Sequence, residues 1–311
     1  MRTFVGGVGR ILVTTGILLL LFVAYQLWGT GLYQTRAQDD LRSRFEQTVH
    51  KGSPSTTTTP AASTGPGATT TTAPPTTTAP PAVTLPSNGD PVASITIPKI
   101  GVDQVVVEGV DIDDLRKGPG RYPATVLPGQ EGNAGIAGHR TTYGAPFGDL
   151  DQLAAGDRIT VRTVQGTFEY RVSDRGPFVV SPDDGSVLDP VADAAHPGHS
   201  LATLTLTTCT PKYSAAQRLI VQADLVLAPN QAPLAATVSG GQTARPHLSV
   251  TTSSRLPAIL WGLAAALVGG LWWLAFRRRR GWITWLGGAV PFLAVLFVAY
   301  SYLERVLPSS Y

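Results

Sequence analysis

Hydrophobic residues in this chain gather in three long uninterrupted runs. The first run, 11–28, carries no charged residue. The other two, 256–276 and 281–303, lie near the C-terminus and are separated by four arginines at 277–280. Because a helix needs about 20 apolar residues to cross a bilayer, the pattern predicts three transmembrane helices. The alternative for the last two runs is a buried helical hairpin in a soluble domain.

Positive charges beside these runs predict their orientation. Two arginines precede the first run, and the four arginines at 277–280 join the other two. Since Lys and Arg concentrate on the cytoplasmic side of a membrane, residues 1–10 and 277–280 are expected in the cytoplasm. No convincing cleavage site follows the first run, so it is interpreted as an uncleaved anchor. Residues 29–255 and the tail 304–311 are then expected outside the cytoplasm.

The chain between the first span and the next strands changes composition. Residues 29–52 are polar and predict a juxtamembrane segment that is helical over 35–51. Residues 53–89 are dominated by Thr, Pro, Ala, Ser and Gly, a composition that cannot bury a core and is typical of a disordered stalk. At about 3.1 Å per residue, this stalk could hold a domain about 100 Å from the membrane. A second linker is expected at 229–255.

Short strands separated by turn residues identify 90–228 as the folded unit. Their number and spacing fit a closed barrel or a sandwich better than alternating β and α units, so a mainly β fold is predicted. Short helices are expected at 112–117 and 148–153. The seven expected strands are 93–97, 105–108, 134–137, 158–164, 167–175, 201–208 and 218–227.

Composition narrows the possible chemistry. Charged residues are 14 % of the 311 residues, against about 25 % in typical domains, which fits membrane spans and linkers. The net charge of +3 is too small to argue for a nucleic-acid partner. A single cysteine excludes an internal disulfide and a multi-thiolate zinc site. A lone thiol is most often a small buried hydrophobe, so a function for Cys209 has to be argued from its neighbours.

Cys209 follows the expected strand 201–208 and precedes Pro211, at a strand end where rigid scaffolds often carry functional groups. A thiol nucleophile needs a base or cation that supplies the thiolate, a donor for the oxyanion, and access. Of the five histidines only His139 ends an apolar strand. Arg218 begins the strand after Cys209, and a hairpin of that length can bring the two together. Each partner also has a structural interpretation, as a loop histidine bonded to the backbone and as a solvated strand arginine.

The residues around Cys209 resemble a known family. The segment Thr-Leu-Thr-Thr-Cys at 205–209 is similar to the sortase signature Thr-Leu-x-Thr-Cys. Gly138 with His139 resembles the family's histidine motif, and Arg218 stands at the family's usual spacing after the cysteine. The resemblance covers 93–228. It implies an eight-stranded sortase-type β-barrel and cysteine transpeptidation, with Cys209 as the acylated nucleophile, His139 as general acid/base and Arg218 as the stabiliser of the oxyanion or substrate.

Three segments resemble class E sortases of high-GC Gram-positive bacteria: 118–123, 132–140 and 209–211. Enzymes of this class prefer a Leu-Ala-x-Thr-Gly signal, and the tyrosine that matches Tyr122 has been linked to that preference. The two C-terminal spans depart from the class, which typically has one N-terminal anchor. A C-terminal span is more familiar in class C enzymes, whose Asp-Pro-Trp/Phe/Gly lid motif is absent before this barrel. The candidate substrate-binding residues are Tyr122, Thr207 and Thr208.

The resemblance implies a membrane-anchored sortase with its catalytic domain outside the cytoplasm. Its partners would be secreted proteins with a sorting signal of the Leu-Ala-x-Thr-Gly or Leu-Pro-x-Thr-Gly type, the membrane, and a peptidoglycan precursor that supplies an amine, of the lipid II type. The signal would be cleaved between Thr and Gly through a thioester. Two alternatives stay open: a class C sortase that polymerises pilins, and a non-enzymatic stalked surface scaffold with a buried structural thiol.

Two groups of acidic residues were considered as metal ligands. Because Asp favours turns, both are interpreted as turn residues, and no metal or cofactor is expected. The groups are Asp111 with Asp113 and Asp114, and Asp183 with Asp184.

Overall fold

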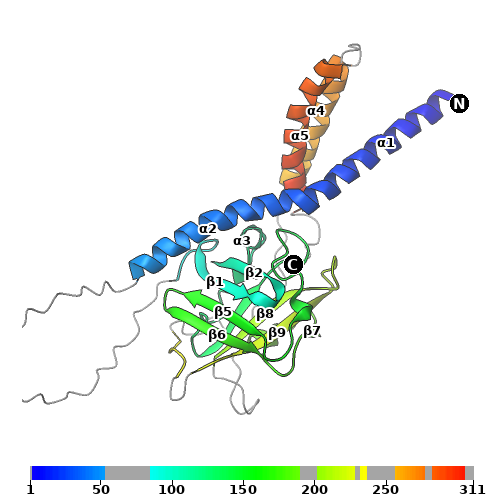
Figure 1. Cartoon of the computed structure of the whole chain (residues 1–311). Coiled ribbons are helices and arrows are strands. Elements are labelled where there is room, and N and C mark those ends of the chain that lie inside the picture. Colours follow the sequence, from blue (N-terminus) through cyan, green and yellow to red (C-terminus); the bar gives the residue numbers. More distant parts are fainter. Residues whose placement is uncertain are drawn as a thin grey trace, which may run out of the picture.

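The computed structural model of the chain shows a β-barrel with helices packed against it (Figure 1). It describes residues 2–52, 85–189, 202–227, 232–236, 256–276 and 282–304. The expected Arg turn, most of the expected stalk and of the second linker, and nearly all of the tail lie outside the described residues.

Nine strands of the described residues form one sheet in the order β6-β5-β1-β2-β3-β4-β8-β9-β7. A further pairing of β6 with β9 closes the sheet, so that all strands except β7 form an eight-stranded ring. Strand β7 pairs with the other end of the same edge of β9. The strands are β1 Pro91–Ile97, β2 Val102–Glu108, β3 Gly120–Arg121, β4 Gly132–Ala137, β5 Arg158–Thr163, β6 Gly166–Val172, β7 Phe178–Val180, β8 Ala202–Thr210 and β9 Gln217–Leu225.

The expected mainly β fold and the eight-stranded barrel are confirmed, and all seven expected strands are present with small differences at their ends. Strands β3 and β7 were not expected, because two and three residues are too few to show a period. Of the two expected helices, the first is α3, Ile112–Leu115, and the second contains a single 3-10 turn, Leu150–Gln152.

Alternation along β8 separates the barrel core from the outer face of the sheet. Leu204, Leu206 and Val221 belong to the apolar cluster that fills the interior. Since successive side chains of a strand point to opposite faces, Thr207 and Cys209 face outward. They are nevertheless buried, so the outer face of β8 is covered as well.

A helix that begins at Arg2 runs without a break along the barrel. Helix α1, Arg2–Ala24, continues through a π-helical turn, Tyr25–Gly29, into α2, Thr30–Gly52. The segment expected as a separate juxtamembrane helix is thus the continuation of α1, and it lies across one side of the barrel (Figure 1).

Helix α2 packs on the outer face of β2. Leu41 and Phe45 form an apolar cluster with Val105 and Val107. The Gln38 amide accepts from the backbone N–H of Val105 at 2.7 Å and donates to its carbonyl at 3.0 Å, so it bonds to β2 as a neighbouring strand would. Helix α1 therefore reaches the barrel through α2, and residues 53–89 connect α2 to the barrel strand β1.

Two C-terminal helices, α4 Leu256–Phe276 and α5 Trp282–Glu304, pack side by side. The Tyr300 hydroxyl of α5 donates to the Leu18 carbonyl of α1 at 2.7 Å. Among the described residues only Leu256–Leu274 is both long and apolar enough to cross a membrane, and the apolar parts of α1 and α5 are shorter. Three transmembrane helices are therefore not confirmed, and this topology stays a prediction.

A buried ion pair fastens the very short strand β3. Arg121, which is fully buried, donates from Nε to Glu108 Oε2 at 2.8 Å and from Nη2 to Oε1 at 2.5 Å. Its Nη1 donates to the carbonyls of Tyr122 at 3.2 Å and of Thr125. The side chain thus holds the segment that leads from β3 to β4.

We expect Arg121→Met to lower the free energy of unfolding by about 3–5 kcal/mol, because it leaves the Glu108 carboxylate buried without its cation. Urea unfolding of the full chain in detergent, followed by circular dichroism, measures the change. The matched control is Arg171→Met, which removes a half-exposed pair with Glu169 and should cost less than about 1 kcal/mol. Equal losses in the two variants would contradict the prediction.

Candidate active site

Cys209 lies near the end of β8, on the outer face of the barrel, and is 1 % exposed. The antiparallel register of β8 with β9 places it directly opposite Arg218, as the hairpin argument predicts. Side chains of such a pair share one face, with β-carbons about 4.5–5.5 Å apart. Arg218 is 5 % exposed, so a buried guanidinium lies beside the thiol. Its Nη1 donates to the carbonyls of Ala215 at 3.1 Å and Gln217 at 3.2 Å.

Strand β4 brings His139 to the opposite side of Cys209. Strands β4 and β8 are parallel, and the pairing continues past the end of β4. The Gly138 N–H donates to the Thr207 carbonyl at 3.0 Å, and the Thr208 hydroxyl donates to the Gly138 carbonyl at 2.7 Å. The same register, extended by two residues beyond its last pair, Ala137 with Thr207, brings His139 alongside Cys209.

Arg140 ties the histidine loop to the cysteine strand. Its Nη1 donates to the backbone carbonyl of Cys209 at 3.1 Å, and its Nη2 forms an ion pair with Asp151 at 3.1 Å. The side chain is 6 % exposed, so this link is shielded from water. It fixes the spacing between the loop that carries His139 and the strand that carries the thiol.

Tyr143 covers His139. The two ring centroids are 5.0 Å apart, and the Thr142 hydroxyl lies 3.3 Å from His139 Nδ1. Tyr143 has a φ of 49°, in the left-handed region that bulky residues rarely adopt, and the next two residues also have positive φ. A turn of this kind persists only where its surroundings hold it. Here the Arg116 Nε donates to the Tyr143 hydroxyl at 2.6 Å.

The first turns of α2 complete the surroundings of Tyr143. The guanidinium of Arg116 lies over the rings of Tyr33 and Tyr143, 5.3 Å from each centroid. The two tyrosine rings meet edge to face at 6.2 Å. The Tyr143 N–H donates to the Thr30 hydroxyl at 3.4 Å. Helix α2 therefore contacts the residue that covers His139.

Tyr122 closes the outer face beside Cys209. Its hydroxyl lies 2.9 Å from the Thr207 hydroxyl. Burial raises the pKa of Tyr122 to about 12, while the Thr207 hydrogen bond and the charge of Arg218 act in the lowering direction. The phenol is therefore protonated at neutral pH and can donate. A Cβ at Gly135 would lie 2.9 Å from the tyrosine ring, so a glycine there lets the ring lie on β4.

The three candidate substrate-binding residues are not equivalent. Tyr122 and Thr207 lie on the same face as Cys209 and bond to each other. Thr208 alternates to the opposite face, and its hydroxyl donates to the Gly138 carbonyl. In this structure Thr208 thus serves the pairing of β8 with the histidine segment.

Sequence reasoning missed three residues of the site. Arg140 had a signal, because it directly follows His139 in the segment that resembles class E. Tyr143 and Arg116 had none, since their contacts with the histidine loop arise only from tertiary packing.

The acidic residues considered as metal ligands have structural roles. The pKa of the Asp114 carboxyl is raised by burial, and Lys117 lies 4.0 Å from it. The Asp184 carboxylate accepts from the Ser186 N–H at 3.2 Å at the start of a 3-10 turn. Within the described ranges, no three His, Cys, Asp or Glu side chains are grouped as a metal site would need.

The sortase domain family model matches residues 95–226. Sortase SrtE1 of Streptomyces coelicolor is 32 % identical over 226 residues, which are 70 % of this chain and 56 % of that protein. Sortase D of Bacillus subtilis is 32 % identical over 126 residues, 40 % of this chain and 58 % of that protein. The chain thus spans little more than half the length of each of these relatives.

Solved structures give a similar result. Sortase E from Streptomyces avermitilis is 38 % identical, with 45 % of this chain and 91 % of that chain covered and a TM-score of 0.40. SrtF sortase from Corynebacterium diphtheriae is 32 % identical, with 48 % and 91 % covered and a TM-score of 0.42.

The match with the family model begins within β1 and ends just after β9. It therefore takes in the eight-stranded ring except for residues 91–94 of β1, and it includes Cys209, His139 and Arg218. On this match, residues 95–226 of the chain form a sortase domain, the domain of a family of cysteine transpeptidases.

Proposed function

We propose that this chain is a membrane-anchored class E sortase whose barrel works outside the cytoplasm. It cleaves a sorting signal of the Leu-Ala-x-Thr-Gly or Leu-Pro-x-Thr-Gly type between Thr and Gly, and it joins the protein to an amine of a peptidoglycan precursor. One observation carries the proposal. Its support is that Cys209 pairs with Arg218 across β8 and β9, and that the parallel register of β4 with β8, which ends at Ala137 with Thr207, leads the segment with His139 alongside Cys209.

In the first half-reaction, the Cys209 thiolate attacks the carbonyl carbon of the signal's threonine and forms a C–S bond. The carbonyl oxygen becomes an oxyanion, which the Arg218 guanidinium stabilises by charge-assisted hydrogen bonds. The C–N bond to glycine then breaks as the His139 imidazolium gives its proton to the leaving amine. The products are a thioester on Cys209 and a free glycine amine.

In the second half-reaction, the amine of the acceptor attacks the thioester carbonyl. His139, now neutral, accepts the proton that the amine loses, and Arg218 again stabilises the oxyanion. The C–S bond breaks, an amide forms, and the thiolate and imidazolium are restored. Atoms and protons therefore balance over the two steps with no other reactant.

The guanidiniums of Arg218 and Arg140 support the reactive form of the thiol. A nearby cation favours the thiolate over the thiol. Because Cys209 is only 1 % exposed, the thioester is shielded from water, which favours transfer to an amine over hydrolysis. A substrate has to part the surrounding side chains to reach it.

The alternatives are separable. The helix pair α4 and α5 is the one observation that favours a class C polymerase, which would produce ladders of covalently linked subunits. The identity to Sortase SrtE1 supports the class E proposal. A non-enzymatic scaffold does not fit a chain with a sortase domain.

Cys209→Ala should abolish cleavage of a Leu-Ala-x-Thr-Gly peptide, with a loss of at least about a thousandfold, because no other thiol exists to form the acyl-enzyme. The assay is chromatography of the products formed by the full chain in detergent with an added glycine amine. An unchanged circular dichroism spectrum is the control for folding. Cleavage by the variant at the wild-type rate would reject the proposal.

Tyr143 is expected to act as a positioning residue for His139. Tyr143→Leu removes the ring that covers the imidazole, and we expect kcat to fall about ten- to a hundredfold with little change in KM. The pH dependence of kcat/KM should shift on the limb that reports His139. Tyr143→Phe keeps the ring and loses only the bond to Arg116, so it serves as the matched control with a smaller effect. A wild-type pH profile for Tyr143→Leu would contradict this role.

Tyr122→Phe should change the choice between alanine and proline at the second signal position. Its hydroxyl bonds to Thr207 on the face of Cys209, and removing a positioned hydroxyl changes discrimination by about three- to tenfold. The measurement is the ratio of kcat/KM for matched Leu-Ala-x-Thr-Gly and Leu-Pro-x-Thr-Gly peptides. An unchanged ratio would remove Tyr122 from specificity and leave the proposed chemistry intact.

A further inference from the structure

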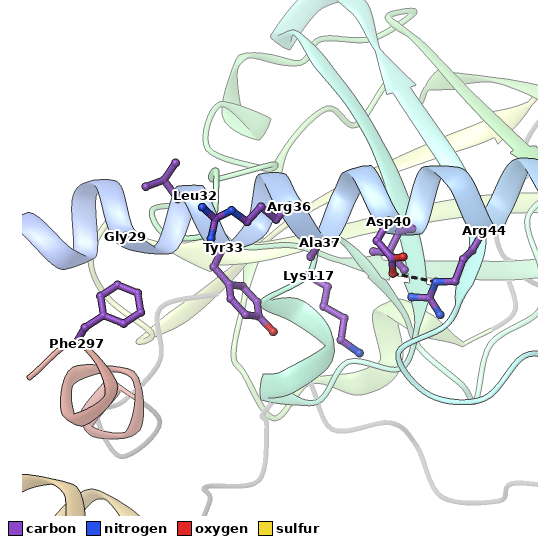
Figure 2. Close-up of a pocket in the computed structure, with 10 residues that line it drawn as sticks. Gly29, Leu32, Tyr33, Arg36, Ala37, Asp40, Arg44, Lys117 and Phe297 are labelled. Carbon is purple, nitrogen blue, oxygen red and sulfur yellow. Dashed lines mark ion pairs between the residues drawn. The ribbon is translucent and has the colours of Figure 1, made fainter. Parts of the chain in front are cut away.

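A groove of about 600 Å³ runs along the flank of α2, between the apolar helices and the barrel (Figure 2). One wall is a continuous face of the helix, formed by residues spaced three or four apart. The opposite wall comes from Lys117, two residues after α3, and from Phe297 of α5. The lining residues used below are Leu32, Tyr33, Arg36, Arg44, Lys117 and Phe297.

Polarity changes along this groove. At the end next to α5, Leu32, Tyr33 and Phe297 are 62 %, 46 % and 52 % exposed. Figure 2 shows Phe297 facing α2 at this end, while Lys117 lies further along the helix. Arg36, one turn after Leu32, is also exposed. Apolar surface thus gives way, in the direction that leads away from α5, to mainly cationic surface in which Asp40 is the one carboxylate of the lining.

The cations of the groove differ in their partners. Arg44 is engaged by two carboxylates, at 2.8 and 3.0 Å. Lys117 forms a loose ion pair with Asp114 at 4.0 Å, and its Nζ donates to the Gly89 carbonyl at 3.4 Å. Within the part of the chain that the structure describes, Arg36 forms no ion pair. Arg36 and Lys117 therefore have charge available for an anion.

The groove begins where the apolar helices converge. The rings of Tyr25 and Phe297 meet edge to face at 5.1 Å, which joins α5 to the N-terminal helix at the start of α2. The helix pair rises from this junction on the side away from the barrel (Figure 1). If these helices lie in the membrane, as the proposed function holds, the apolar end of the groove faces the lipid and the cationic end faces the headgroups.

We propose that this groove binds one anionic phospholipid of the membrane, a proposal that rests on the membrane anchoring in the proposed function. The headgroup phosphate lies on Arg36 and Lys117, which bind it by charge-assisted hydrogen bonds. An acyl chain covers Leu32 and Phe297, which are otherwise exposed to water. A free phosphate would use the cationic end alone, so the exposed apolar end selects a lipid.

The test uses the full chain in nanodiscs of phosphatidylcholine with a minority of phosphatidylglycerol, and it counts retained lipids by native mass spectrometry. We expect the wild type to retain one phosphatidylglycerol in preference to phosphatidylcholine. The double variant Arg36→Gln with Lys117→Gln should lower that preference at least about tenfold. The matched control Arg42→Gln removes another exposed cation of α2, paired with Asp103 outside the groove, and should keep it.

Three outcomes would overturn the lipid site. They are an undiminished preference in the double variant, an equal loss in the Arg42→Gln control, and displacement of the lipid by millimolar inorganic phosphate. Leu32→Asn gives an independent arm, since it should weaken lipid retention with both cations in place. Peptide cleavage is measured on the same samples as a separate assay. If the wild type cleaves the peptide through Cys209 but shows no lipid preference, the lipid site is rejected and the proposed function stands. Loss of cleavage in the wild type would instead reject the proposed function.

Discussion

The parallel pairing of β4 with β8 is the contact on which the site depends. It joins segments 70 residues apart, and the bonds between Gly138, Thr207 and Thr208 extend it beyond the end of β4. The pairing puts His139 level with the cysteine, whereas the partnership of Cys209 with Arg218 needs only a local hairpin. Arg140 then donates a hydrogen bond from the histidine loop to the Cys209 carbonyl. Two interactions, the strand pairing and this hydrogen bond, therefore hold the histidine loop beside the cysteine strand.

Around this pairing, buried charged side chains hold segments that have little regular secondary structure of their own. Strand β3 has two residues, and the Glu108–Arg121 pair holds it in place. The turn at Tyr143 has strained dihedral angles, and Arg116 binds its hydroxyl. Such pairs are poor sources of net stability, but breaking one leaves an uncompensated charge. They are therefore suited to fixing the segments beside Cys209 in one arrangement.

Much of the barrel could be predicted because its longer strands alternate clearly, and the partnership of Cys209 with Arg218 followed from chain spacing. The two shortest strands, β3 and β7, could not be predicted, because so few residues show no alternation. The position of β3 depends instead on tertiary contacts such as the pair of Glu108 with Arg121. Helix α2 was expected, but its docking was not, because a polar segment gives little sign that Gln38 bonds to the backbone of β2. Tyr143 was missed for the same reason: its role exists only once α2 is in place.

The docking of α2 also changes where the catalytic unit begins. The family match starts at residue 95, inside β1, and a fragment cut there would look complete by homology. It would lack Thr30 and Tyr33, which contact Tyr143, and Leu41 and Phe45, which cover the outer face of β2. The boundary of the folded unit therefore lies on the N-terminal side of the boundary that homology draws, at the first turn of α2.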